Sequence, residues 1–218
     1  MESIPPRLRT TIQHVCTDMW DGYANAAEEF AEAHPDVTLE VIVDRFHVAE
    51  NYRKCVDELR KAECRRLKKE LPADEYEKIT GMMWIVRQNN DDLTPDERIK
   101  LRLLFEYSPL LKAAYTLREE LTAIFELPLT QEEGKRRLEL WAEKVKRSGL
   151  KAFDTFLKTL HKWVDRIAAY FTHRFNSGFV EGLNNKIKVL KRRCYGLFNV
   201  KTLFRRVNLD LEGYRLFP

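Results

Sequence analysis

FNSGFVEGLNNKIKVLKRRCYG, residues 175–196, is the stretch that decides how the rest of the chain is interpreted. Its opening Asn-Ser-Gly, residues 176–178, favours a turn that leads into a helix. Apolar residues then recur at alternating steps of three and four, which predicts one apolar helix face. That face consists of Val180, Leu183, Ile187, Leu190 and Cys194. A second face carries Glu181, Asn184, Asn185, Lys188 and Arg192.

The predicted helix begins with one acid and then becomes strongly basic. No Asp or Glu occurs between Glu181 and Asp210. The basic residues in that interval are Lys186, Lys188, Lys191, Arg192, Arg193, Lys201, Arg205 and Arg206. A single carboxylate ahead of such a run is typical of a metal-dependent site that faces a phosphate backbone. The alternative is a solvated helix face, with Glu181 favoured in the first turn by the helix dipole alone.

Composition indicates a globular chain with a sizeable core, organised as one large domain or two small ones. The 218 residues are 44% hydrophobic and 33% charged, with a net charge of +4. None of the four cysteines forms a CxxC pair, so neither a zinc ribbon nor a disulfide framework is indicated. This cysteine usage favours a reducing cytoplasm. The longest apolar run, residues 82–86, is too short to span a bilayer, and the N-terminus has no signal-peptide pattern.

The first fifty residues predict a strand, a helix and a second strand. Residues 10–17 and 37–43 are rich in β-branched residues, and residues 23–31 between them have helical spacing. Each predicted strand is followed by an aspartate, Asp18 or Asp44. Such a unit makes parallel strands, whose carboxyl ends face the same crevice. We therefore expect Asp18 and Asp44 at one edge of the sheet.

The region 48–170 shows helical periodicity and no alternating strand pattern, so we expect it to be almost wholly helical. Helix starts are indicated at Thr94, Ser108 and Thr130, the first two followed by proline. We expect this region to form its own packed layer. The residues predicted to be buried there are Leu104, Phe105, Tyr115, Leu121, Trp141, Phe153, Phe156 and Trp163.

Three carboxylates at element ends, Asp18, Asp44 and Glu181, are candidates for chemistry. Carboxylates gathered in a crevice suit Mg²⁺ or Mn²⁺, and two such ions can activate a water or a 3′-hydroxyl for phosphodiester chemistry. The alternative is that Asp18 and Asp44 are ordinary strand-end caps. His47 lacks further ligands at zinc spacing, so a packed or hydrogen-bonding role is favoured over metal binding.

Five blocks of the sequence together resemble a known family. They are DMWDGY at 18–23, VDRFHV at 43–48, NSG at 176–178, EGLNNKIK at 181–188 and KRRCYG at 191–196. In combination, and over nearly the whole chain, they resemble the C-terminal part of the catalytic domain of a bacterial insertion-sequence transposase. The type is the DDE class, in the subgroup written ISL followed by three.

This resemblance implies a ribonuclease-H-like core with three catalytic acids and Mg²⁺- or Mn²⁺-dependent DNA cleavage and strand transfer. The last acid carries over to Glu181 and the second to Asp18, both as metal ligands that we expect to come together. Asp44 and His47 would lie in or beside the site. The expected fold is α/β, with a partial ribonuclease-H-like core in residues 1–50. An all-helical insertion would occupy 51–172, and 173–218 would hold the helix with the final acid and a basic end.

The family's first acid lies on an earlier strand of a three-strand meander, whereas only seventeen residues precede Asp18. We therefore expect a truncated catalytic domain that is inactive alone. A complete triad of Asp18, Asp44 and Glu181 is disfavoured, because one helix between two acids leaves no room for the meander.

The expected partner is double-stranded DNA at transposon ends, with a homo-oligomer as a further option and no membrane. The residues expected to contact DNA are Asn185, Lys186, Lys188, Lys191, Arg192, Arg193, Arg205 and Arg206. Two alternatives stay open. One is a DNA-binding or oligomerising transposase remnant without catalysis, and the other is a helical scaffold with no nucleic-acid role.

Overall fold

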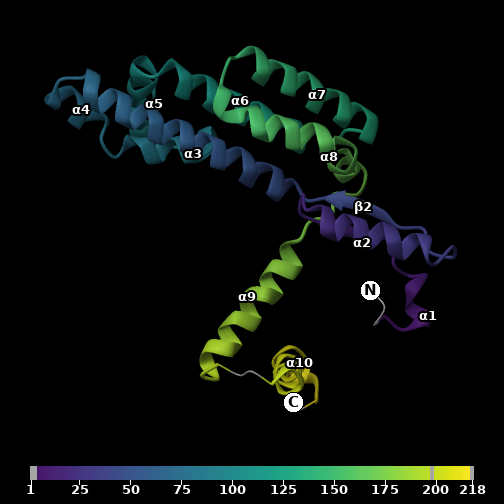
Figure 1. The fold of residues 1–218 in the computed structure, drawn as a ribbon. Coiled ribbons are helices and arrows are strands. Elements are labelled where there is room, and N and C mark those ends of the chain that lie inside the picture. Colours follow the sequence, from purple (N-terminus) through teal and green to yellow (C-terminus); the bar gives the residue numbers. More distant parts are fainter. Residues whose placement is uncertain (1–3, 197–198, 217–218) are drawn as a thin grey trace. The chain divides into compact units, whose positions relative to one another are not determined.

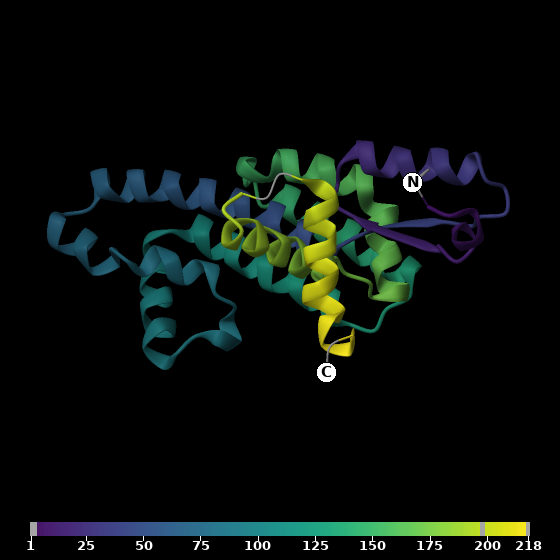
Figure 2. The same ribbon diagram turned by 90° about the horizontal axis from the view of Figure 1, so that it is seen from below.

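Two short parallel strands lie near the start of the chain in the computed structural model, which describes residues 4–196 and 199–216. Strand β1 (His14–Thr17) pairs with β2 (Glu40–Val43), with His14 opposite Glu40 and Thr17 opposite Val43. Helix α2 (Asp21–Glu32) connects the two strands and runs alongside them (Figure 2). The expected strand–helix–strand unit with parallel strands is therefore confirmed.

Both strands are shorter than predicted, and a turn lies before each of them. Pro6 occupies the first position of α1 (Pro6–Arg9), where a missing N–H costs nothing. The Thr11 hydroxyl then donates to the Leu8 carbonyl at 2.7 Å, which holds Thr10 and Thr11 in a turn. Before β2, the Val37 N–H donates to the His34 carbonyl at 2.8 Å, so the chain is still turning there. Local hydrogen bonds thus outweigh the β-branched composition that favoured longer strands.

Residues 45–173 form helices and short 3-10 helices joined by loops, with no strand among them. The long helix α3 runs outward from the strand pair to α4, and α6, α7 and α8 lie alongside one another (Figure 1). The α-helices are α3 (Arg45–Glu70), α4 (Ala73–Ile79), α5 (Pro95–Tyr107), α6 (Pro109–Glu126), α7 (Gln131–Arg147) and α8 (Asp154–His173). The 3-10 helices are η1 (Met82–Arg87), η2 (Asn90–Asp92) and η3 (Lys151–Phe153). The expectation of an almost wholly helical region from 48 to 170 is confirmed.

Side-chain caps begin the helices where the sequence indicates them. Thr94 accepts from the Glu97 N–H while the Glu97 carboxylate accepts from the Thr94 N–H, a complete capping box. Ser108 accepts from Leu111 N–H at 3.3 Å, and Thr130 accepts from Glu133 N–H at 3.3 Å. Each cap satisfies one of the N–H groups that a helix start leaves without an intrahelical acceptor.

Aromatic side chains join the helices around Tyr52, which is fully buried on α3. Its ring lies 4.8 Å from that of Phe153, and its hydroxyl donates to the Ala114 carbonyl at 2.7 Å. Trp141 donates its indole N–H to the Leu117 carbonyl at 2.9 Å. Of the eight residues predicted to be buried, Phe105 is the exception, because it is partly exposed at the edge of this core. Helix α8 packs against both α7 and β2, so one core covers the helices and the sheet. The expectation that the helical region packs as a layer of its own is therefore wrong, because α8 places its apolar face on β2 as well as on α7.

Gly134 on α7 is the position where a small change should cost most in the α7–α8 contact. A β-carbon there would lie 2.1 Å from the Phe171 ring, which is buried and stacked on Phe125 at 5.4 Å. Gly134→Ala should therefore destabilise the fold by roughly 1–3 kcal/mol, even though alanine has the better helix propensity. Urea unfolding measures this change. Leu140→Ala on an exposed part of the same helix should stay within about 0.5 kcal/mol of the wild type; equal stabilities for the two variants would contradict the packing argument.

The chain divides into two compact units, residues 1–175 and 176–218. The second unit contains α9 (Gly178–Arg193) and α10 (Val200–Leu216), which contact each other. Taken element by element, the molecule is mostly helical with a two-stranded parallel sheet. The ribonuclease-H-like assignment and the domain boundaries at 50 and 172 stay predictions.

Candidate functional site

Asp18 and Asp44 lie at the same edge of the strand pair. Each follows the last residue of its strand, and those last residues, Thr17 and Val43, are paired in register. The Asp44 N–H continues the ladder by donating to the Thr17 carbonyl at 3.2 Å. Asp18 is half-buried, and from the described residues its carboxylate receives only a long contact, 3.5 Å, from the Thr17 hydroxyl. The Asp18 carboxylate oxygens can therefore still bind a metal ion or accept another hydrogen bond.

Asp44 has a different environment from Asp18, because it is only 2% exposed and begins a helix. Its carboxylate accepts from the Phe46 N–H at 2.9 Å and so caps α3. The nearby Cys16 thiol has its pKa raised to about 11, mainly by burial and further by the negative charge of Asp44. Cys16 thus stays a neutral thiol beside this edge. Asp44 holds α3 against the strand end.

His47, in the first turn of α3, makes polar and ring contacts. Its Nδ1 lies 3.7 Å from a Glu50 carboxylate oxygen, and its ring meets the edge of Phe46 at 5.7 Å. Among the described residues, His47 belongs to no group of three metal-ligating side chains. The role of His47 stays a prediction.

Glu181 lies in the first turn of α9, in the second unit. The helix begins at Gly178 as predicted, with the Gly178 N–H donating to the Asn176 side chain at 3.0 Å. The Ser177 hydroxyl donates to one Glu181 carboxylate oxygen at 2.9 Å. This bond orients a half-buried carboxylate, whose other oxygen has no hydrogen bond to a described residue. The expected approach of Glu181 to Asp18 stays a prediction, because the two residues belong to different units.

Lys186 differs from the other basic residues predicted to contact DNA, because it is paired within the fold. Its Nζ lies 2.8 Å from the Asp210 carboxylate on α10 and 3.3 Å from the Asp210 backbone carbonyl. The Lys186 ammonium lowers the pKa of Asp210. Sequence reasoning missed Asp210, because nothing in a linear pattern indicates which helix face meets another.

The remaining cations of the predicted interface are exposed. Within 176–196 and 199–216, ion pairs join Lys186 to Asp210 and Arg215 to Glu212, and none engages the others of the predicted set. These exposed residues are Lys188, Lys191, Arg192, Arg193, Arg205 and Arg206, and Asn185 is exposed as well. Residues 197 and 198, inside the basic run, lie outside the described part of the chain. Unpaired surface cations are the groups that contact nucleic-acid phosphates.

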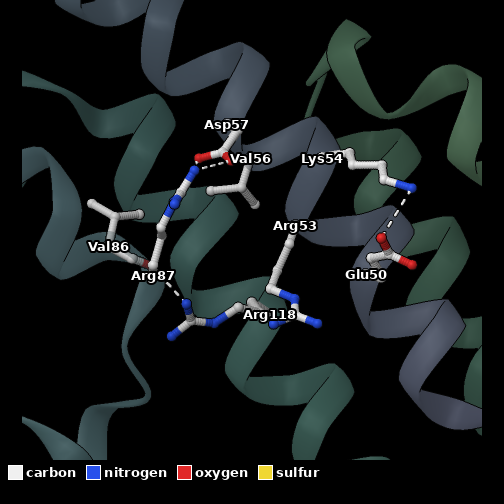
Figure 3. Close-up of a pocket in the computed structure, with 8 residues that line it drawn as sticks. All are labelled: Glu50, Arg53, Lys54, Val56, Asp57, Val86, Arg87 and Arg118. Carbon is white, nitrogen blue, oxygen red and sulfur yellow. Dashed lines mark hydrogen bonds and ion pairs between the residues drawn. The ribbon is translucent and has the colours of Figure 1, made fainter. Parts of the chain in front are cut away.

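A hollow between α3, η1 and α6 gathers four basic residues, but its charges are used internally (Figure 3). Arg87 forms a two-pronged ion pair with Asp57, and Lys54 pairs with Glu50 at 3.3 Å. Arg118, 7% exposed, donates to the Val86 carbonyl at 2.6 Å. The bonds of Arg87 and Arg118 fix the irregular η1 segment to α3 and α6. We therefore assign the hollow to the architecture of the helical layer.

Comparison with known proteins gives one consistent group of relatives. A family model for ISL3-type DDE proteins, described as "Transposase", matches residues 1–207. The transposase for insertion sequence element IS1001 of Bordetella parapertussis is 30% identical over 215 residues, covering 97% of this chain and 50% of that protein. The transposase for IS1557 of Mycobacterium tuberculosis is 28% identical over 138 residues, covering 63% of this chain and 31% of that protein. The chain thus spans about half the length, or less, of these relatives.

No solved structure matches the chain. Among the described residues, no helix is both long and apolar enough to cross a membrane. The near-complete family match, together with the relative that aligns along 97% of the sequence, shows that this chain belongs to the ISL3 family of DDE transposases.

Proposed function

We propose that this chain is a catalytic-domain segment of a DDE transposase, which performs metal-dependent DNA strand cleavage and transfer in the intact enzyme. The observation that carries the proposal is the environment of two carboxylates, Asp18 and Glu181, in a chain that belongs to the ISL3 family. Asp18 follows a parallel strand with little hydrogen bonding, and Glu181 opens a helix whose later turns carry exposed cations.

The two acids have the donor set that Mg²⁺ or Mn²⁺ prefers. Both metals favour carboxylate oxygens and retain positions for water and phosphate. Asp18 and Glu181 are each half-buried, and each offers an oxygen with no strong hydrogen bond. In this proposal they hold the metal, which when bound activates the attacking hydroxyl or water and stabilises the leaving oxygen.

Asp44 and His47 support the same edge in the proposal. Asp44 fixes the first turn of α3 directly beside the end of β1, through its cap to Phe46 and its N–H bond to Thr17. His47 sits one turn further, and its N–H donates to the Asp44 carbonyl at 3.0 Å. Rigid placement of neighbouring backbone is what keeps a metal-binding carboxylate in position.

DNA binding should fall when exposed cations of α9 are removed. Lys188→Ala and Arg192→Ala should each reduce the slope of log affinity against log salt by about 0.9, because each releases one phosphate contact. The loss should be similar on unrelated duplexes, since phosphate contacts carry no sequence information. Glu181→Gln should bind equally well or slightly better, because it removes a negative charge. Titrations of two unrelated duplexes at several salt concentrations measure these slopes.

Lys186→Ala is the informative comparison for those titrations. Because Lys186 is bound to Asp210, its removal should mainly loosen the contact between α9 and α10. A thermal melt of the second unit should therefore shift more for Lys186→Ala than for Lys188→Ala. Salt-independent or absent DNA binding by the wild type would remove the nucleic-acid role and leave a solvated helix face.

A second candidate function is DNA binding without catalysis. The observation that favours it is that the exposed cations predicted to contact DNA all lie on α9 and α10, and phosphate contacts by these cations need neither Asp18 nor a metal. The two functions separate in one experiment on labelled transposon-end DNA with and without Mn²⁺, carried out with a longer chain that also carries the family's first acid. Metal-dependent nicking supports the catalytic proposal, whereas metal-independent retention without nicking supports the binding function.

A further inference from the structure

Three metal-ligating side chains meet at the edge of the sheet opposite Asp18 and Asp44. His14 begins β1, Glu40 begins β2, and the register pairs them directly. His173, the last residue of α8, is the third. Since a strand rises about 3.3 Å per residue, this edge lies about 10 Å from the edge that carries Asp18 and Asp44, which we call the acid edge. The cluster is therefore separate from the acids of the proposed catalytic site.

The ligand atoms of the three side chains converge. The Nε2 atoms of both histidines face the same oxygen of Glu40, at 3.0 Å from His173 and 3.9 Å from His14. One ligand atom from each residue lies within 4.8 Å of the other two. The imidazole centroids are 4.2 Å apart with the rings inclined at 55°, so both rings direct an edge to one point.

The surroundings hold this convergence in place. Phe175 stacks on His173 at 5.5 Å and meets His14 edge-on at 5.0 Å. Arg174, in the left-handed conformation at φ 56°, ends α8 immediately after His173. Its guanidinium donates to the carbonyls of Phe125 and Leu127, which anchors the end of the helix. All three ligands are only partly exposed, at 24%, 39% and 29% of their side-chain surface.

We propose that His14, Glu40 and His173 bind one divalent transition-metal ion of the Zn²⁺ type. Two imidazole nitrogens and one carboxylate oxygen, with water in the fourth position, form a common zinc ligand set. Ligands about 2.0–2.1 Å from a tetrahedral ion lie about 3.3 Å from one another, so the pair at 3.9 Å needs to close by about 0.6 Å, and no pair within 4.8 Å needs to close by more than about 1.5 Å. Mg²⁺, which prefers oxygen ligands, is a poor fit to this site and a good fit to carboxylates.

The ion would cross-link three elements that are distant in sequence. Glu40 and His173 are separated by 133 residues, and the metal would tie both to β1. It would fix the end of α8 to the start of the sheet. Phe175, the last residue of the first unit, follows two residues later. This inference needs neither DNA binding nor the acids Asp18 and Glu181, so it can fail or hold independently of the proposed function.

A titration of the metal-stripped, full 218-residue chain with Co²⁺ tests the site, because Co²⁺ in a four-coordinate nitrogen and oxygen environment has visible absorption bands. The wild type should bind one equivalent, and Zn²⁺ should displace it whereas excess Mg²⁺ should not. Glu40→Gln and His173→Gln should each weaken Co²⁺ binding at least tenfold. The matched control is His161→Gln, an exposed histidine on the same helix. It should bind as the wild type does.

Thermal unfolding gives a second readout of the same site. Zn²⁺ should raise the melting temperature of the wild type and of His161→Gln, and should leave that of Glu40→Gln unchanged, because only a native-state ligand stabilises. Glu40→Gln keeps the size and shape of the side chain, so its circular dichroism should match the wild type. Absent visible bands in the wild type, or affinity unchanged in folded Glu40→Gln, would overturn the site. The three residues would then form only a hydrogen-bonded His–Glu cluster.

Discussion

Replacing Glu181 by Gln, or Asp18 by Asn, is expected to reduce metal-dependent strand cleavage on the order of 10³-fold in a chain that also carries the family's first acid. A bound metal contributes several kcal/mol to the transition state, and each 1.36 kcal/mol corresponds to about tenfold in rate. Both replacements preserve side-chain shape and remove one metal-binding charge. DNA affinity should be unchanged or slightly higher, so the loss should appear in turnover and in Mn²⁺ binding.

Asp21→Asn is the matched control for this experiment. Asp21 lies three residues from Asp18, is exposed, and pairs with Lys162 at 2.6 Å on the surface. Its replacement changes the net charge by the same amount and should leave cleavage within about twofold of wild type. Full cleavage by Asp18→Asn, or an equal loss in Asp21→Asn, would show that the transfer of the second family acid onto Asp18 is wrong.

Glu63→Ala is expected to destabilise the first unit by roughly 2–4 kcal/mol, because it leaves the buried Ser108 hydroxyl without its acceptor and removes a hydrogen-bonded partner of Arg66. Glu63 is 4% exposed on α3. It accepts from Arg66 at 2.7 Å and from the Ser108 hydroxyl at 2.5 Å. Ser108 both ends α5 and caps α6, so this one carboxylate holds three helices together. Urea unfolding should show the loss, while Glu58→Ala, at an exposed position of α3, should stay near wild type.

The same carboxylate should make stability depend on acid pH. Hydrogen bonding from Arg66 lowers the pKa of Glu63 below its ordinary value of 4.5. Because the folded-state pKa is depressed, the stabilisation is fully present above pH 4.5 and is lost as pH falls through the lowered value. The difference in unfolding free energy between wild type and Glu63→Gln should therefore shrink between pH 6 and about pH 3. A constant difference across that range would exclude a charged Glu63 as the source of stability.

Local signals in the sequence predicted the helical layer well. Thr94, Ser108 and Thr130 were identified as helix starts because their side chains can satisfy N–H groups without help from distant residues. The prediction of a strand at 10–17 was wrong for its first four residues, for a related reason. Pro6 and the Thr11 hydroxyl make local turns there, and a β-branched composition measures only how well a residue fits a sheet that is already present.

Features that depend on distant residues could not be predicted. The exposure difference between Asp18 and Asp44 arises because α3 starts directly after Asp44 and buries it, whereas Asp18 precedes a loop of two residues. The pairing of Lys186 with Asp210 and the convergence of His14 with His173 both need the tertiary fold. In the sequence alone, Lys186 is one cation in a basic run, and His173 is an isolated histidine.

Helix α3 gives the acid edge a mechanical connection to the far end of the helical layer. Its 26 residues make a rod about 39 Å long that begins at the Asp44 cap and ends beside α4 (Figure 1). No hinge residue interrupts the rod, since it contains neither proline nor glycine. A tilt of about 5° at the edge would move the distal end by about 3 Å. A partner that binds α4 and displaces it would therefore move α3, and with it the backbone at the ends of the strands.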